Sequence, residues 1–110
     1  LLDLLLRSLI KSFLSIPIGE RIGAYMAFPQ SIVDTAWKRA GGKCECTRST
    51  HSHGARCSKT LSYNNRGKDS AWGAWEAHHI VSVAAGGKDT LSNCEILCLD
   101  CHKKTGSYGG

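Results

Sequence analysis

Apolar residues dominate the first sixteen positions, LLDLLLRSLIKSFLSI, and polar residues interrupt them in a helical pattern. The polar positions 3, 7, 8, 11, 12 and 15 form one stripe along a helix of about four turns and leave a wide apolar face. The segment is too short and too charged to span a bilayer, which takes about 20 mostly apolar residues, and it lacks the basic start of a signal peptide. We expect an amphipathic helix that docks on its own domain, a second copy, a partner protein or a membrane surface.

From residue 31 onward the pattern predicts a compact domain. A helix is expected over residues 31–40, with Ser31 as its N-cap and Gly41 after its end. Residues 44–69 are rich in Cys, His, Gly, Ser and Asn, which predicts loops, and strand-like residues follow between 72 and 83. A short apolar run at 96–99 precedes a final helix. The pattern therefore predicts an α+β domain at 31–106, an amphipathic helix with its connection at 1–30, and a flexible tail at 107–110.

Composition locates a positive charge on the predicted domain. The chain has 110 residues, a length that suits one domain, and a formal net charge of +5. Residues 1–35 hold three basic and three acidic groups, so the whole excess lies in residues 36–110. A basic segment favours a polyanionic partner such as nucleic acid, although a solvated basic surface explains the charge equally well.

The six cysteines form a pattern typical of zinc. Cys98 and Cys101 have the C-x2-C spacing of a zinc knuckle, and two further thiolates are needed to complete a tetrahedral site. We expect Cys44 and Cys57 to supply them, with Cys46 as the substitute for Cys44. Only one cysteine of the Cys44 and Cys46 pair is expected to bind this zinc.

The alternative reading is three disulfides, but no secretory signal indicates an oxidising compartment. The insertion from Thr47 to Arg56 lengthens the turn of the expected knuckle hairpin. Its histidines, His51 and His53, are expected to be solvated, with metal ligation as the alternative. Cys94 is expected to be a buried thiol.

Three histidines and one asparagine carry the candidate chemistry. His78 and His79 are adjacent in the expected strand, so their side chains point to opposite sides. His102 directly follows Cys101, so the zinc would fix the start of the helix that carries it. Asn93 lies in the intervening loop, where its amide can hydrogen-bond backbone groups and hold the shape of the loop.

The stretch from Ala77 to Thr105, AHHIVSVAAGGKDTLSNCEILCLDCHKKT, resembles the HNH endonuclease family, the beta-beta-alpha-metal nucleases. It shares the paired histidines, the Gly-Gly turn, Ser-Asn, Leu-Cys-x2-Cys-His and the trailing Lys-Thr. The resemblance covers about residues 31–106. It implies a small treble-clef-like ββα-metal domain that is braced by a four-cysteine zinc site and hydrolyses phosphodiester bonds of DNA, by nicking or by double-strand cleavage.

The resemblance also implies a role for each residue. His79 is the general base, His78 and His102 hold one divalent cation, and Asn93 orients the loop and through it His79. The cation is expected to be Mg²⁺ or Mn²⁺, with other transition metals possible because His78 stands where many relatives have aspartate. The alternative function is a zinc-stabilised nucleic-acid-binding module without hydrolysis. The expected partners are DNA and, through residues 1–30, a second copy or another protein; the expected location is the cytoplasm, in a bacterial or phage-encoded setting.

Several further side chains are weaker candidates. Lys103 and Lys104 are placed either to meet phosphates or to be solvated at a helix end. Trp72 and Trp75 are expected in the core, with DNA contact as the alternative for Trp72. Glu76 either buttresses a histidine or is simply exposed. A diffuse basic stretch is expected to contact the DNA backbone and consists of Arg48, Arg56, Lys59, Arg66 and Lys68.

Overall fold

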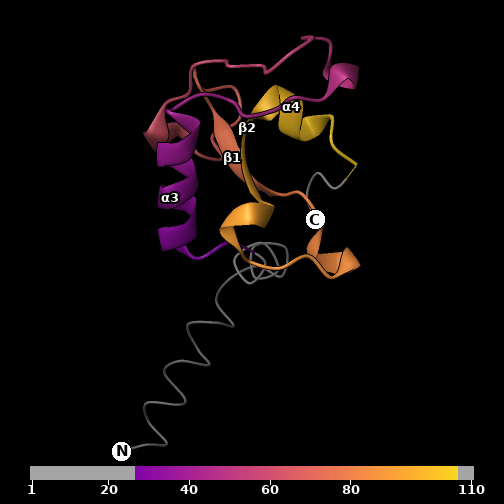
Figure 1. Ribbon diagram of the computed structural model, residues 1–110. Coiled ribbons are helices and arrows are strands. Elements are labelled where there is room, and N and C mark those ends of the chain that lie inside the picture. The colour runs from indigo at the N-terminus through magenta and orange to yellow at the C-terminus, as the bar shows by residue number, and fades with distance from the viewer. Residues whose placement is uncertain (1–26, 107–110) are drawn as a thin grey trace, which may run out of the picture.

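The computed structural model describes residues 27–106 and contains two helices and one two-stranded sheet in that range (Figure 1). Along the chain these are helix α3 (Gln30–Ala40), strand β1 (Trp75–His79), strand β2 (Cys94–Cys98) and helix α4 (Leu99–Lys103). Short 3-10 turns occupy parts of the connections. The α+β prediction is therefore confirmed. The expected helix at 1–16 and the expected tail at 107–110 lie outside the described residues.

Helix α3 begins earlier than its sequence suggests. Pro29 precedes its first residue, and the Pro29 carbonyl accepts hydrogen bonds from the backbone N–H groups of Ile32 and Val33. Ser31 therefore lies inside the first turn and is not the N-cap, because the preset backbone angle of proline already provides the entry into the helix. The helix ends as expected at Gly41, which has a φ of 67° and donates to Trp37 and Lys38.

The sheet lies between the two helices, with α3 and α4 on opposite sides (Figure 1). Strands β1 and β2 pair antiparallel, in a register that sets Trp75 opposite Cys98, Ala77 opposite Ile96 and His79 opposite Cys94. These six residues share one face, since residues directly opposite each other point the same way. Trp37 of α3 packs on Trp75 of this face, with ring centroids 4.7 Å apart.

Strand β1 is shorter than the strand-like composition of residues 72–83 suggests. After His79, the Asn93 side chain hydrogen-bonds both backbone groups of Val81. Its Oδ1 accepts from the Val81 N–H at 2.7 Å, and its Nδ2 donates to the Val81 carbonyl at 3.0 Å. A side chain thus satisfies the groups that a neighbouring strand would otherwise bind. The chain can then leave the sheet and form the loop of residues 80–93.

The cysteine-rich segment forms the expected knuckle hairpin. Backbone hydrogen bonds join Cys44 to Lys59 and Ser58, and Cys57 to Cys46. Residues 43–46 also lie beside β2, because the Glu45 N–H donates to the Ile96 carbonyl at 2.8 Å. The insertion from Thr47 to Arg56 closes this hairpin, as its length suggested.

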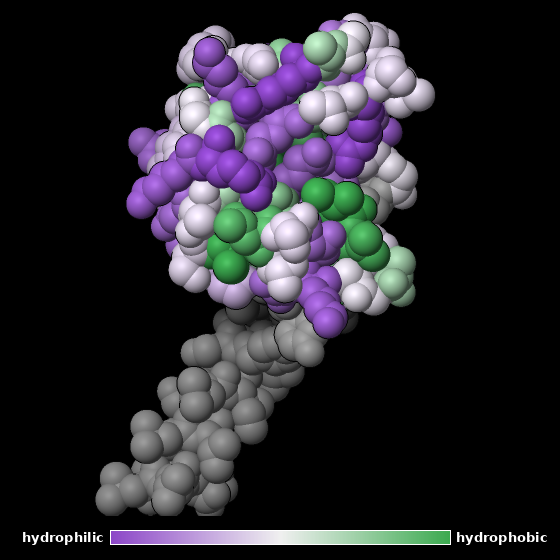
Figure 2. All heavy atoms as spheres, viewed as in Figure 1, coloured by the Kyte–Doolittle hydropathy of each residue, from purple (hydrophilic) through white to green (hydrophobic). Residues whose placement is uncertain are grey.

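The core is formed by apolar side chains of α3, both strands and the knuckle hairpin. Val33, Ala36 and Ile96 are fully buried, and Trp75 is 1% exposed, so its core prediction is confirmed. Trp72 is 71% exposed, so its core prediction is wrong. The face drawn in Figure 2 is mostly hydrophilic and is broken by two apolar patches. Within residues 27–106, no helix has the length and hydropathy needed to cross a membrane.

Candidate functional site

Four cysteine sulfur atoms converge where the knuckle hairpin meets the end of β2 and the start of α4. The Sγ atoms of Cys44, Cys57, Cys98 and Cys101 all lie within 4.8 Å of one another. A tetrahedral zinc with Zn–S bonds of about 2.3 Å requires sulfur atoms roughly 3.8 Å apart. The cluster therefore fits a structural zinc ion, and the structure brings the four expected ligands together.

The surroundings of these sulfur atoms also suit zinc. The backbone N–H of Cys98 donates to Cys44 Sγ at 3.2 Å, and that of Cys101 donates to Cys98 Sγ at 3.4 Å. A hydrogen bond from Cys44 lowers the pKa of Cys98 to about 5, while the same bond raises the pKa of Cys44 and burial raises that of Cys101. Cys98 thus ionises readily, whereas Cys44 and Cys101 resist ionisation. A divalent cation among them would favour the thiolate form of these neighbours as well.

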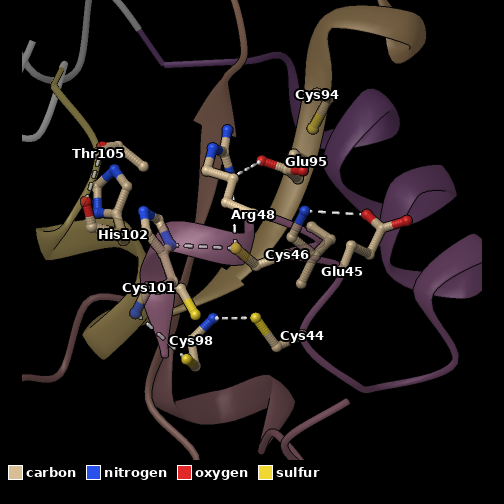
Figure 3. Close-up of polar contacts among 12 residues, drawn as sticks. Cys44, Glu45, Cys46, Arg48, Cys94, Glu95, Cys98, Cys101, His102 and Thr105 are labelled. Carbon is tan, nitrogen blue, oxygen red and sulfur yellow. Dashed lines mark hydrogen bonds and ion pairs between the residues drawn. The ribbon is translucent and has the colours of Figure 1, made fainter. Parts of the chain in front are cut away.

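Cys46 does not stand in for Cys44. It lies beside Cys101 but in a second group of ligand atoms, together with His51 and His53. Figure 3 shows Cys46 between the Arg48–Glu95 ion pair and the sulfur atoms of Cys44 and Cys101. His51 is only 6% exposed, so the expectation of a solvated loop histidine is wrong for this residue.

His78 and His102 face each other across the side of the sheet that α4 covers. His78 projects from β1 and His102 from the last turn of α4, and their ring centroids are 5.2 Å apart at an angle of 71°. Burial lowers the pKa of both side chains, to about 4 for His78. Both rings are therefore neutral at physiological pH, which is the form that binds metal ions. The structure brings these two predicted ligands together.

His79 points to the opposite face of β1 and is not part of that pair. Its ring stacks on Phe28, with centroids 3.7 Å apart and planes 12° from parallel. Its Nε2 lies 2.7 Å from Asp89 Oδ1. Because a carboxylate only accepts, Nε2 carries the hydrogen and Nδ1 is left as the basic nitrogen.

Asn93 connects the loop of residues 80–93 to the end of β1. Besides its two bonds to Val81, its Nδ2 donates to the Lys88 carbonyl at 2.9 Å, and its own backbone carbonyl accepts from Ile80 at 3.0 Å. The loop also requires Gly87, since a Cβ atom there would lie 1.8 Å from the Val81 carbonyl oxygen. The loop that carries Asp89 is therefore held at both ends, and Asp89 is positioned against His79.

Most of the basic side chains expected to contact DNA form contacts inside the domain. Arg56 donates to the carbonyls of Ala40, Lys43 and Cys44, and Lys103 pairs with Asp69 at 2.8 Å. The remaining contacts are the ion pairs Arg48–Glu95, Lys59–Asp100 and Arg66–Glu76 and a hydrogen bond from Lys104 to the His51 carbonyl. Glu76 therefore binds Arg66, and its charge partly offsets the effect of burial on the pKa of His102.

Two residues beside His79 have no counterpart in the sequence-based predictions. Phe28 precedes the expected domain start, yet it is 5% exposed and belongs to the core. Asp89 lies ten residues after His79 in a polar loop. The Gly-Gly turn two residues before Asp89 was a signal that the loop folds back, but spacing alone does not show which side chain meets the ring.

Comparison with known proteins agrees with these features. Residues 55–107 match the model of the family described as HNH endonuclease. The chain is 30% identical over 112 aligned residues to the type IV methyl-directed restriction enzyme EcoKMcrA of Escherichia coli strain K12. The alignment covers 94% of this chain and 35% of that enzyme, so the chain spans about a third of its relative's length. No solved structure matches the chain. The family match covers the second half of the knuckle hairpin, both strands and α4, and residues 55–107 thus belong to the HNH endonuclease family.

Proposed function

We propose that this domain is a metal-dependent endonuclease that hydrolyses phosphodiester bonds of DNA. The observation that carries the proposal is the pair of buried, neutral imidazoles of His78 and His102, in a domain of the HNH endonuclease family. Two neutral histidines on facing elements are ligands for a divalent cation such as Mg²⁺ or Mn²⁺, or for a softer transition metal. The cation, when bound, polarises the scissile phosphate and stabilises the leaving 3′ oxygen.

His79 is proposed to accept the proton of the attacking water. Asp89 holds Nε2 and so keeps the ring in the tautomer whose Nδ1 is basic. Stacking on Phe28 restricts rotation of the ring. A base fixed in this way does not have to be oriented during the reaction.

Asn93 is proposed to act through the backbone. Its four hydrogen bonds fix the ends of the loop that carries Asp89, and through Asp89 they set the orientation of His79. Asn93 is thus a positioning residue in this proposal. The zinc cluster has a similar part, because Cys98 and Cys101 fix the first turn of α4 and His102 follows directly.

The relative's name suggests a substrate setting. EcoKMcrA is described as methyl-directed, and we propose that the present chain likewise cleaves DNA as part of a restriction activity. Because the chain spans about a third of that enzyme, recognition of methylated sites is a separate question from cleavage. Plasmid prepared with and without methylation distinguishes the two.

Plasmid cleavage tests the proposal. Supercoiled DNA is incubated with the purified protein in Mg²⁺, in Mn²⁺ or in chelator, beside His78→Ala and the surface control Ala84→Ser. The expected result is metal-dependent conversion to open-circular or linear DNA by the wild type and by Ala84→Ser, with strong loss in His78→Ala. DNA binding without conversion in either metal would instead favour the alternative, a zinc-stabilised nucleic-acid-binding module. The four-cysteine cluster, which needs no catalytic role, is the observation that keeps this alternative open.

A further inference from the structure

A second group of metal-ligand atoms lies beside the four-cysteine cluster. It consists of Cys46, His51, His53 and Cys101, whose ligand atoms all lie within 4.8 Å of one another. Cys46 is fully buried and His51 is 6% exposed, although both belong to or adjoin a polar surface loop. Cys46 Sγ lies 3.2 Å from His51 Nδ1, so the two side chains are in direct contact.

The hydrogen bonding of His53 leaves one of its two ring nitrogens available as a metal ligand. His53 Nδ1 lies 2.7 Å from the Ala55 carbonyl oxygen, which only accepts, so Nδ1 carries the hydrogen. When the ring is neutral, Nε2 is therefore a lone-pair acceptor, and it is buried with no hydrogen-bond partner within the described part of the chain. A histidine that donates one N–H to a carbonyl and directs its other nitrogen to a cluster of ligands has the arrangement typical of metal-binding histidines.

The shared residue, Cys101, connects the two groups. Cys44 lies in the first group and Cys46, two positions along the chain, in the second. Both groups need Cys101 to reach four ligands. A thiolate has enough lone pairs to bind two metal ions, so Cys101 can complete both tetrahedra at once.

Charge balance favours two ions over one. One Zn²⁺ with four thiolates has a formal charge of −2, whereas two Zn²⁺ ions with the five thiolates of both groups have −1. Burial of net charge is costly, so the second ion reduces the cost of burying these thiolates. Arg48 Nη1 lies 3.6 Å from Cys46 Sγ and offsets part of the remaining charge.

We propose that Cys46, His51 and His53 hold a second zinc ion together with Cys101, so that the domain contains a two-zinc cluster bridged by the Cys101 thiolate. This ion would fix residues 46–53 beside the nuclease pair. Arg48 of that segment binds Glu95, the strand partner of His78, at 2.8 Å, and Lys104 donates to the His51 carbonyl. The proposal concerns metal content and does not depend on the proposed nuclease activity.

Zinc stoichiometry tests the proposal. Wild-type protein, His53→Ala, His53→Cys and the loop control Thr50→Ala are purified by gel filtration in excess Mg²⁺, and zinc is measured by mass spectrometry against protein concentration. We expect two zinc ions per chain in the wild type and in Thr50→Ala and one in His53→Ala. His53→Cys is expected to retain two, because a thiolate replaces the imidazole. Circular dichroism is expected to show that His53→Ala keeps its fold, since the four-cysteine cluster is intact.

His78→Ala separates this site from the nuclease pair. It is expected to retain both zinc ions in this preparation. One zinc ion in the wild type, or two in His53→Ala, would overturn the proposal, and so would a second ion that is lost in His78→Ala and kept in His53→Ala. If His53→Ala fails to fold, the zinc ligands of the wild type and of His53→Cys, measured by X-ray absorption, test the proposal instead.

X-ray absorption at the zinc edge gives an independent answer. The bridged cluster has four sulfur ligands on one ion and two sulfur with two nitrogen ligands on the other, which averages to three sulfur and one nitrogen atom per zinc. A zinc–zinc scattering contribution is also expected. His53→Cys would shift the average toward sulfur. An all-sulfur environment in the wild type would contradict the second site.

Discussion

At the scale of single residues, the contact between His79 and Asp89 gives His79 a different environment from that of His78 and His102. His78 and His102 are neutral because they are buried. His79, in contrast, is held by a carboxylate that is itself 47% exposed. The two faces of β1 therefore place the proposed metal ligand and the proposed base in different electrostatic environments.

Asp89→Asn is expected to reduce DNA cleavage by up to about 100-fold, the lower end of what a general base contributes. Asparagine can donate as well as accept, so it no longer fixes the tautomer of His79. Single-turnover cleavage and plasmid binding are measured side by side, and binding is expected to be unchanged. Weaker DNA binding with an unaltered cleavage rate would assign Asp89 to substrate contact and contradict its role as a positioning residue.

Gly87→Ala tests the loop that carries Asp89. The added Cβ would collide with the Val81 carbonyl oxygen, so the bonds from Asn93 to Val81 must break or lengthen. We expect faster hydrogen exchange at the Val81 amide and reduced cleavage. Gly106→Ala is the matched control, because no atom lies within 4 Å of the Cβ position there. Unchanged exchange at Val81 in Gly87→Ala would show that the loop is held by other contacts.

At the scale of elements, one arginine of α3 connects the helix to two other parts of the domain. Arg39 donates to both carboxylate oxygens of Glu45 and to the backbone carbonyls of Leu91 and Cys94. Glu45 in turn accepts from the Ile96 N–H. This group of contacts connects the helix, the knuckle hairpin and the start of β2. The hydrogen bond and ion pair with Glu45 raise the pKa of Arg39 further above its ordinary value.

Arg39→Met is expected to lower the free energy of unfolding by about 1–2 kcal/mol. The change removes four hydrogen bonds from a partly exposed group and leaves the Glu45 carboxylate without its positively charged partner. Urea denaturation monitored by tryptophan fluorescence measures the change. Lys38→Met on the same helix is the control and is expected to change stability by less than about 0.5 kcal/mol. Equal midpoints for the two variants would contradict the bridging role of Arg39.

At the scale of the whole molecule, zinc compensates for the small amount of regular structure. The two strands have five residues each and α4 has five, and elements of this size are marginal on their own. The Cys44, Cys57, Cys98 and Cys101 cluster joins both ends of the domain. We therefore expect the described fold to depend on metal binding as well as on its core.

Removal of zinc by a strong chelator is expected to unfold the domain in one cooperative step. Loss of the near-ultraviolet circular dichroism of the packed Trp37 and Trp75 rings reports the transition. Added Zn²⁺ is expected to restore the signal, and Mg²⁺ is not, since magnesium prefers oxygen ligands. A fully retained signal after all zinc has been removed would show that the core is sufficient without the metal.

The sequence predicted the local features and the two groups of expected metal ligands, but not the contacts that no motif marks. The Cys98–Cys101 spacing, the apolar run of β2 and the His-His pair each follow from residues close together in the chain. The stacking of Phe28 on His79 joins residues 51 positions apart, and no local pattern indicates it. Likewise Cys44 and Cys46 are two positions apart in the sequence, and only the fold shows that they belong to different groups of ligand atoms.

The most direct test of the account is the rate of plasmid cleavage by His79→Ala in Mg²⁺ or Mn²⁺. The variant leaves the zinc cluster and the His78–His102 pair in place, so it changes the proposed base alone. A loss of about 100-fold or more is predicted, with zinc content and circular dichroism unchanged. Cleavage by His79→Ala at the wild-type rate would contradict the assignment of His79 as the general base.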